Sequence, residues 1–513
     1  MYLRAGFFSL GLLLLSRVLG LLRETVQAAA FGSSGLGDAV IVMFTLPDLL
    51  VGILFSGALA YVLLPVWALQ SGVEKQASQK TVTRVLLAGG LLLGGVVWLF
   101  RDLMVQALAP GLGASMKALG ASSLAWSAGV LPLAMLAALW VTRLQHERDF
   151  VGMYTGNLLV NGLLVLALLG VAGSRATDSN RHVMLLGAFL LLAMLARLGW
   201  LSWRLARTTA APKHEPEPEP EPAKPSVDRL AAADNRAQLP QASVWIWAAL
   251  SSGLLLLLPL MGRSLASQSG EGALANFNYA WKLVELPLVL AIQLVASLAF
   301  PAITRTTAGS QARQESLQVA FLLAWMLACA AIAIVATFSL PLASLLFGWG
   351  RMSAASLLTI AHWSAIGVWS LLPQALIAVL LTVMAISQQM HVAVAAYVIG
   401  IVALGLAAWA GLADGAMVMW ALNGILAGVA VLLLVSQGRS LRGALPWPAM
   451  LLALLTCAAL VLCKPWFANL SLLWVLPVCA MFALLVGASA LANPLLRRKL
   501  GLSQRMLQSF TQP

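Results

Sequence analysis

"FFSLGLLLLSRVLGLLRETVQAAAF", residues 7–31, is an apolar segment long enough to cross a lipid bilayer, yet Arg17, Arg23 and Glu24 lie near its middle. A membrane-spanning helix needs about 20 mostly apolar residues. An arginine at the bilayer centre costs roughly 2.5–3.5 kcal/mol even on the gentlest scale. We therefore expect these three charged side chains to face the interior of a helix bundle or water, and not the lipid.

The composition of the whole chain agrees with this interpretation. Of its 513 residues, 61% are hydrophobic and 10% are charged, and the mean hydropathy is +0.91. A soluble domain has about 25% charged residues. The apolar runs are too long for barrel strands and do not alternate. We predict an all-α integral membrane protein with about fourteen transmembrane helices. The estimated spans are 5–31, 39–69, 85–109, 121–142, 151–173, 183–203, 244–268, 273–304, 316–343, 354–386, 392–412, 416–436, 447–465 and 471–494.

Two short motifs recur at nearly the same offset. "LPLAMLAAL" at 131–139 resembles "LPQALIAVL" at 372–380, and "TLPDLL" at 45–50 resembles "ELPLVL" at 285–290. The first pair falls in the fourth and tenth predicted spans, and the second pair in the second and eighth. These matches predict two six-helix lobes related by a pseudo-two-fold axis along the membrane normal, plus two extra C-terminal helices. Secondary transporters are often built from paired repeats of this kind.

The polar segment 212–240, with its Pro–Glu alternation, cannot bury a core and is expected to stay extended. We predict that it belongs to a cytoplasmic linker between the lobes. The predicted organisation is an N-lobe at 1–206, a linker at 207–243, a C-lobe at 244–436, and two C-terminal helices with a cytoplasmic tail at 437–513.

The distribution of positive charge predicts the orientation in the membrane. The net charge is +13, and the predicted loops on the side of both termini hold twenty Lys and Arg against seven on the other side. The positive-inside rule places the richer side in the cytoplasm, so we predict that both termini are cytoplasmic. Because this rule explains the charge, nucleic acid is not a predicted partner. The four cysteines lack metal-ligand spacing, and we predict no metal and no cofactor.

Charged residues inside the spans leave two interpretations open. Arg17 and Glu24 share one helix face, with Arg23 about 120° from Arg17, and Lys282 and Glu285 form an i, i+3 pair. In one interpretation, Arg17–Glu24 and Lys282–Glu285 are ion pairs that only fasten helices together. In the other, Arg17, Arg23 and Lys282 line a hydrated cavity and hold a diphosphate, since guanidinium groups suit phosphate oxygens. Outside this set, we expect Arg197 to reach toward the membrane surface.

The opening of the chain, "SRVLGLLRETVQAAAFGSSGLGDAVIVMFTLPDLL" followed by "GALAYVLLP", resembles the MurJ (MviN) family of bacterial lipid II flippases. "NYAWKLVELP" with "AFPAITR" resembles the eighth helix of that family. The family belongs to the multidrug/oligosaccharidyl-lipid/polysaccharide exporter superfamily. The resemblance implies that Arg17, Arg23 and Lys282 match functional cations and that Asp38 matches an acid at the start of the second helix.

Taken with the residue pattern, the resemblance predicts the site. Arg17, Arg23 and Lys282 are expected to bind substrate, and Glu24, Asp38 and Glu285 to line or gate the cavity. No catalytic residue is predicted.

The chain departs from the family pattern at several places. Val51 and Gly52 replace a basic pair, Ser56 replaces a glutamate, Trp281 replaces an acid, and "SQQMHVA" at 387–393 replaces an Asp-Thr-x-Thr-Pro pattern. Cavity charges of both signs are therefore missing. One interpretation is drift with compensation. The other is a divergent paralogue that handles another polyprenyl-diphosphate glycan, such as an exopolysaccharide unit.

The predicted function is movement of a polyprenyl-diphosphate-linked saccharide from the cytoplasmic to the outer leaflet of the bacterial inner membrane by alternating access. Lipid II, the peptidoglycan precursor, is the first candidate substrate, and membrane lipids are further partners. No Walker A motif is present, so direct use of ATP is not expected, and no residue identifies a coupling ion. A membrane enzyme acting on lipid-linked sugars is the rival, but the five histidines are scattered and no loop offers paired carboxylates. A drug or small-ion exporter would require an acidic surplus instead.

Overall fold

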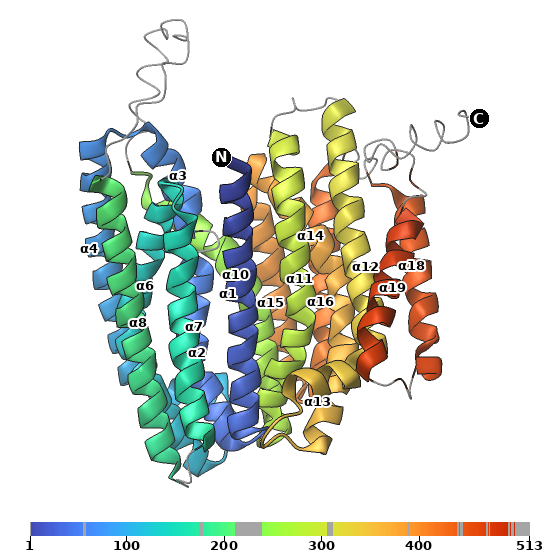
Figure 1. Ribbon diagram of the computed structural model, residues 1–513, viewed down its shortest axis with the longest axis horizontal. Helices are drawn as coiled ribbons and strands as arrows, with labels where there is room; N and C mark the ends of the chain where they lie inside the picture. The colour runs from blue at the N-terminus through green and yellow to red at the C-terminus, as the bar shows by residue number, and fades with distance from the viewer. Residues whose placement is uncertain are drawn as a thin grey trace, which may run out of the picture. The chain divides into compact units, whose positions relative to one another are not determined.

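The computed structural model describes residues 2–54, 58–173, 178–210, 239–304, 311–387, 389–438, 445–467 and 472–490, together with 441, 470, 493 and 497. Within these residues the regular structure is helical throughout, with no strand (Figure 1). The predicted all-α fold class is confirmed. The side chains of residues 2–10 and 289–304 fall outside the description, as do 211–238, which contain most of the predicted linker.

The chain divides into two compact units. Unit 1 comprises Met1–Leu257 and Gly270–Ala275, and unit 2 comprises Leu258–Ser269 and Asn276–Pro513. Two helices, α10 (Ala242–Ala266) and α11 (Ala273–Thr304), have residues in both units. The other helices of unit 1 are α1 (Tyr2–Phe31), α2 (Gly35–Ile53), α3 (Leu59–Leu69), α4 (Gly72–Leu99), α5 (Arg101–Leu108), α6 (Ala114–His146), α7 (Phe150–Gly173) and α8 (Ser179–Ala210).

Unit 2 contains the later helices and three short 3-10 turns. They are η2 (Ser267–Ser269), α12 (Gln311–Phe347), α13 (Ala354–Gly367), η3 (Val368–Ser370), α14 (Leu371–Ile386), α15 (Met390–Trp409), α16 (Gly415–Ser436), α18 (Trp447–Leu462), η4 (Lys464–Phe467) and α19 (Leu472–Ala490). The predicted bounds of the lobes and the two-fold relation between them stay predictions.

Every predicted span contains a helix, and ten helical segments among the described residues are long and apolar enough to cross a membrane. The count of fourteen stays a prediction. Several boundaries differ from expectation. The second span contains α2 and α3, with residues 55–57 between them outside the described part. The fourth begins at Ala114 instead of residue 121, and the third begins at Gly72, well before residue 85. At this earlier start, Ser71 and Glu74 form a capping box, with the Ser71 amide donating to the Glu74 carboxylate at 2.7 Å. Local polar chemistry thus extends the helix beyond its apolar part.

Small residues let the helices of unit 1 approach closely. A Cβ at Gly90 would lie 2.7 Å from Cα of Pro132, and one at Gly94 would lie 2.6 Å from the carbonyl oxygen of Ala128. These contacts join α4 to α6. Helices in a membrane gain little from the hydrophobic effect and depend on such close packing. The main core of the unit combines residues of α1, α2, α6, α7 and α8, which also carry the charged cluster described below.

Pro47 interrupts the backbone hydrogen bonding of α2 just before Asp48. Proline has no amide hydrogen, so the carbonyl of Met43, four residues earlier, loses its helical partner. The hydroxyl of Ser127 on α6 donates to that carbonyl instead. A side chain of a neighbouring helix thus satisfies the freed group, as a lipid environment requires.

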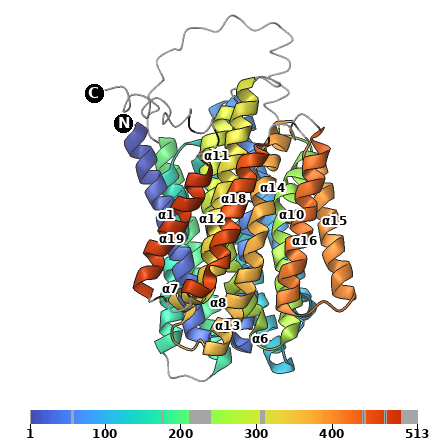
Figure 2. The same ribbon diagram turned by 90° about the vertical axis from the view of Figure 1, so that its right-hand side faces the viewer.

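Aromatic packing organises the later helices of unit 2. Phe338, Phe467 and Phe482 form a three-ring cluster with centroid separations of 5.5–5.8 Å. They come from α12, η4 and α19, and α12 also packs against α18 (Figure 2). Tyr279 of α11 contacts Phe347 of α12 at 4.9 Å between centroids. These contacts fix α11, and with it the charged pair of unit 2, on α12.

Candidate functional site: charged residues inside the helices

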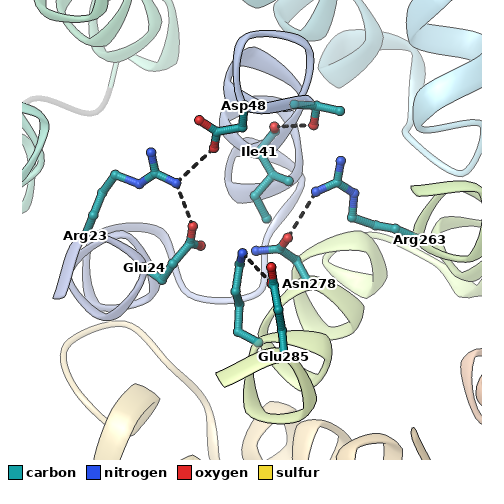
Figure 3. A network of polar contacts seen from close by, with 9 residues as sticks. Arg23, Glu24, Ile41, Asp48, Arg263, Asn278 and Glu285 are labelled. Carbon is teal, nitrogen blue, oxygen red and sulfur yellow. Dashed lines mark hydrogen bonds and ion pairs between the residues drawn. The ribbon is translucent and has the colours of Figure 1, made fainter. Parts of the chain in front are cut away.

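Arg23 is the centre of a charged cluster in unit 1. Its Nη2 donates to Oε1 of Glu24 at 2.9 Å and to Oδ2 of Asp48 at 3.0 Å (Figure 3). Its guanidinium carbon also lies 5.4 Å from the ring centroid of Phe44. The cluster therefore joins α1 to α2. Charge-assisted bonds of this kind are stronger than neutral ones, and the aromatic ring adds a cation–π contact.

The two carboxylates around Arg23 differ in exposure. The side chain of Glu24 is 8% exposed, whereas that of Asp48 is 55% exposed. Removing one partner of a buried ion pair strands the other charge and is strongly destabilising. Glu24 is thus the buried counterion of Arg23, and Asp48 is its more exposed acidic partner.

Arg17 lies on the exposed surface of α1. The periodicity of the helix suggested Glu24 as its partner, but Glu24 accepts from Arg23. Arg17 lies within electrostatic range of the Tyr154 hydroxyl on α7. Nearby on the same helix, Gly20 packs on Asn161 of α7. The structure therefore separates the surroundings of the two arginines: Arg23 is held inside the unit, and Arg17 is exposed on its surface.

Arg197 does not reach the membrane surface, so the expectation for this residue was wrong. It lies on α8 and is only 3% exposed. Gly156 of α7 lies against its aliphatic stem, since a Cβ there would be in van der Waals contact with Cγ of Arg197 at 3.5 Å. Helix α8 contacts α2, which carries Asp48, an acid within electrostatic range of Arg197. Sequence reasoning missed this member of the cluster, although a basic residue deep in an apolar span is itself a signal of function.

Asp38, expected to line or gate the cavity, is buried in the first turn of α2 and binds backbone groups. Its Oδ2 accepts from the amide of Gly272 and its Oδ1 from the amide of Ala275, each at 2.8 Å. These amides are at the start of α11, where the first backbone N–H groups lack helical partners. Asp38, a residue of α2, therefore caps the start of α11. Gly272 has φ +79°, and its backbone lies against that of Ser33, which glycine alone permits at low cost.

Unit 2 holds a more exposed pair. Lys282 Nζ donates to Oε2 of Glu285 at 2.8 Å, and the two side chains are 32% and 39% exposed. This contact has the predicted i, i+3 spacing. One turn away, Arg263 of α10 donates to the side-chain oxygen of Asn278 at 3.0 Å (Figure 3). Trp281, at the place where an acid was expected, stacks on Phe277 with the rings 4° from parallel.

The fold is that of a membrane transporter. A MurJ lipid II flippase in an inward closed conformation matches 96% of this chain and 99% of its own, with a TM-score of 0.74 and 15% identity. A multidrug resistance MATE family transporter in an inward-facing conformation matches 86% of this chain and 95% of its own, with a TM-score of 0.60 and 14% identity. At these identities the likeness concerns the fold.

The sequence comparisons are more specific. The family model described as "Lipid II flippase MurJ" matches residues 27–486. A lipid II flippase MurJ of Burkholderia cenocepacia is 25% identical over 366 residues, which are 69% of this chain and 67% of that protein. A probable lipid II flippase MurJ of Rickettsia prowazekii is 32% identical over 111 residues, covering 21% and 22% of the two chains.

The chain thus belongs to the lipid II flippase MurJ family, and it shares its fold with a MATE transporter. It is a multi-pass membrane protein and a transporter, not an enzyme. The family predicted from the opening segment and the eighth helix is confirmed. The roles predicted for individual residues stay proposals.

Proposed function

We propose that this protein moves lipid II from the cytoplasmic to the outer leaflet of the bacterial inner membrane by alternating access. Membership of the MurJ family supports the substrate, and the excess of basic residues on one side supports a cytoplasmic location of both termini. The observation that carries the proposal is Arg23, a guanidinium inside a membrane helix with a half-exposed carboxylate as one of its two acidic partners.

The diphosphate of the substrate binds to Arg17 and Arg23 in unit 1. Arg17 is exposed and offers its guanidinium directly. Arg23 is already oriented by Glu24, so binding costs little side-chain entropy. Both groups match phosphate oxygens in a bidentate manner. For unit 2 we propose Lys282 as a further substrate-binding cation, with Glu285 as the acid that neutralises it when no substrate is bound.

Asp38 serves as a gating residue through the start of α11. A carboxylate that binds two backbone amides holds that helix end in one position. Alternating access requires some helix ends to be held in one state and released in another. Asp38 is suited to this task because its two carboxylate oxygens bind two separate amides at the start of the same helix.

Binding of lipid II to the purified full-length protein tests the site. Arg23→Gln should lower the affinity at least tenfold, since one charged phosphate contact is lost. Arg84→Gln is the matched control, because it removes the same charge from an exposed position of α4. The same variants are then tested for growth of a bacterium depleted of its own lipid II flippase. Equal affinity and growth for Arg23→Gln and the wild type would refute the proposed site.

A second substrate is favoured by the packing around Gly52. Family members usually have a basic pair at positions 51 and 52, but here a Cβ on Gly52 would lie 2.9 Å from Leu256 of α10. A long basic side chain at that position would require the Leu256 side chain to move aside. A substrate head group meets an uncharged surface at these positions instead of a basic pair. This difference suits another polyprenyl-diphosphate glycan, such as an exopolysaccharide unit. Depletion of the protein decides between the two substrates, since the untransported lipid-linked intermediate accumulates.

A further inference from the structure

Arg197 is only 3% exposed, and its guanidinium has a buried nitrogen without a hydrogen-bond partner in the part of the chain that the structure describes. Its Nε is buried and makes no bond. An arginine does not escape this condition by losing its proton, because the guanidinium stays charged in proteins. Burying an unpaired charge is among the most costly arrangements in a protein. A carboxylate bonded to Arg197 would therefore stabilise it at this position.

Asp48 is the acid within electrostatic range of Arg197. In this structure it bonds to Arg23 at 3.0 Å, and its side chain is the more exposed of the two acids that bind Arg23. Glu24 already supplies Arg23 with a buried counterion at 2.9 Å. Among the described residues, Arg23 is thus bonded to two acids, and no acid forms an ion pair with Arg197. Asp48, the more exposed of the two acids, has the freedom to change partners.

The backbone around Asp48 also allows a change of partner. Asp48 directly follows Pro47, where the backbone hydrogen bond of α2 is missing and the Ser127 hydroxyl satisfies Met43. Sharp changes in helix direction occur mostly at such points. A small bend there moves Asp48 relative to α1 without breaking a regular helical bond.

We propose that Arg197 is a positioning residue of the anion site. Arg197 receives the Asp48 carboxylate when a substrate diphosphate replaces that carboxylate on Arg23. The inference rests on the proposed function, because the diphosphate of the lipid-linked substrate is the displacing anion. Glu24 stays on Arg23 throughout. After the exchange both buried arginines have an anionic partner, so binding of the substrate removes the unpaired charge on α8 and draws α2 toward it.

The affinity of the purified full-length protein for lipid II tests the exchange. Arg197→Gln should weaken binding about tenfold, because the displaced Asp48 then has no new partner and competes for Arg23. Arg197→Lys should stay within about threefold of the wild type, because the charge is retained. Asp48→Asn should tighten binding about fivefold, since no carboxylate must leave Arg23.

The double variant Asp48→Asn/Arg197→Gln separates this role from its rivals. We expect the same affinity as for Asp48→Asn alone, because Arg197 acts only through Asp48. A tenfold loss that persists in the double variant would show that Arg197 touches the ligand or maintains the fold, and would overturn the proposal. Unchanged affinity of Arg197→Gln would also overturn it.

A second variant keeps the test valid if Arg197→Gln does not fold. Asp48 is half exposed, so Asp48→Asn should leave the protein stable, and weaker or unchanged binding by this variant contradicts the exchange. Arg23→Gln reports on the proposed function itself. If Arg23→Gln loses affinity while Asp48→Asn and Arg197→Gln both bind as the wild type does, the proposed site stands and the exchange is refuted.

Discussion

The charged pairs of unit 1 and unit 2 have nearly equal lengths but very different surroundings. Arg23–Glu24 measures 2.9 Å and Lys282–Glu285 measures 2.8 Å. The side chains of the first pair are 11% and 8% exposed, and those of the second are 32% and 39% exposed. Distance alone therefore does not show which pair contributes more to stability. Burial shows it, because water can replace a lost partner at an exposed site but not at a buried one.

Removing the acid from each pair should give the largest contrast. Glu24→Ala strands Arg23 in a buried site and should lower the free energy of unfolding by about 3–5 kcal/mol. Asp48 softens the loss, since it keeps one bond to Arg23. The matched variant Glu285→Ala should cost about 1 kcal/mol or less. Reversible unfolding of the purified protein in mixtures of mild detergent and SDS measures both. Equal losses in the two variants would remove the distinction between the pairs.

The two units also differ in how far their charged contacts were predictable from sequence. The Lys282–Glu285 contact follows from an i, i+3 spacing within one helix, and the structure has it. The Arg23–Asp48 contact joins α1 to α2, and no local pattern specifies which side chains two helices bring together. Arg197 was misplaced for the same reason, since a helical position does not indicate which neighbouring helix covers it.

Helix positions were predictable where apolar runs set them, and less so where polar groups did. The eighth predicted span, 273–304, coincides with α11. The third begins early because Ser71 and Glu74 cap the helix before its apolar part. The burial of Asp38 could not be predicted, because its partners are backbone amides more than 230 residues away in the chain.

Asp38 is a buried acid that accepts from two backbone amides, and its removal should have the next largest effect. Asp38→Ala removes two bonds from backbone amides to a carboxylate, so we expect a loss of about 2–4 kcal/mol in unfolding free energy. Amide hydrogen exchange at Gly272 and Ala275 should accelerate in this variant, because those amides lose their acceptors. Asp38→Asn is the control and should retain part of the protection. Unchanged exchange at both amides would contradict the capping role.

Lys282 should combine a small effect on stability with a large effect on transport. Lys282→Ala leaves Glu285 in a partly exposed position, so the unfolding free energy should change by about 1 kcal/mol or less. If Lys282 binds the substrate, growth supported by the variant should fail at normal protein levels. Growth is scored in a flippase-depleted bacterium, with immunoblots for protein level. Full growth would assign Lys282 to the structural ion-pair interpretation, which its contact with Glu285 also permits.

Arg17 should show the smallest effect on stability of all, because it is exposed and no ion pair involves it among the described residues. Arg17→Ala should change the unfolding free energy by less than about 0.5 kcal/mol, as exposed substitutions usually do. Its affinity for lipid II should nevertheless fall about tenfold, since a charged phosphate contact is lost. The affinity of Arg17→Lys should lie between those of the wild type and Arg17→Ala. An ammonium group keeps the charge but lacks the planar guanidinium that binds two oxygens. Wild-type affinity in Arg17→Ala, together with weakened binding in Arg23→Gln, would restrict the phosphate site to the buried arginine and exclude the exposed one.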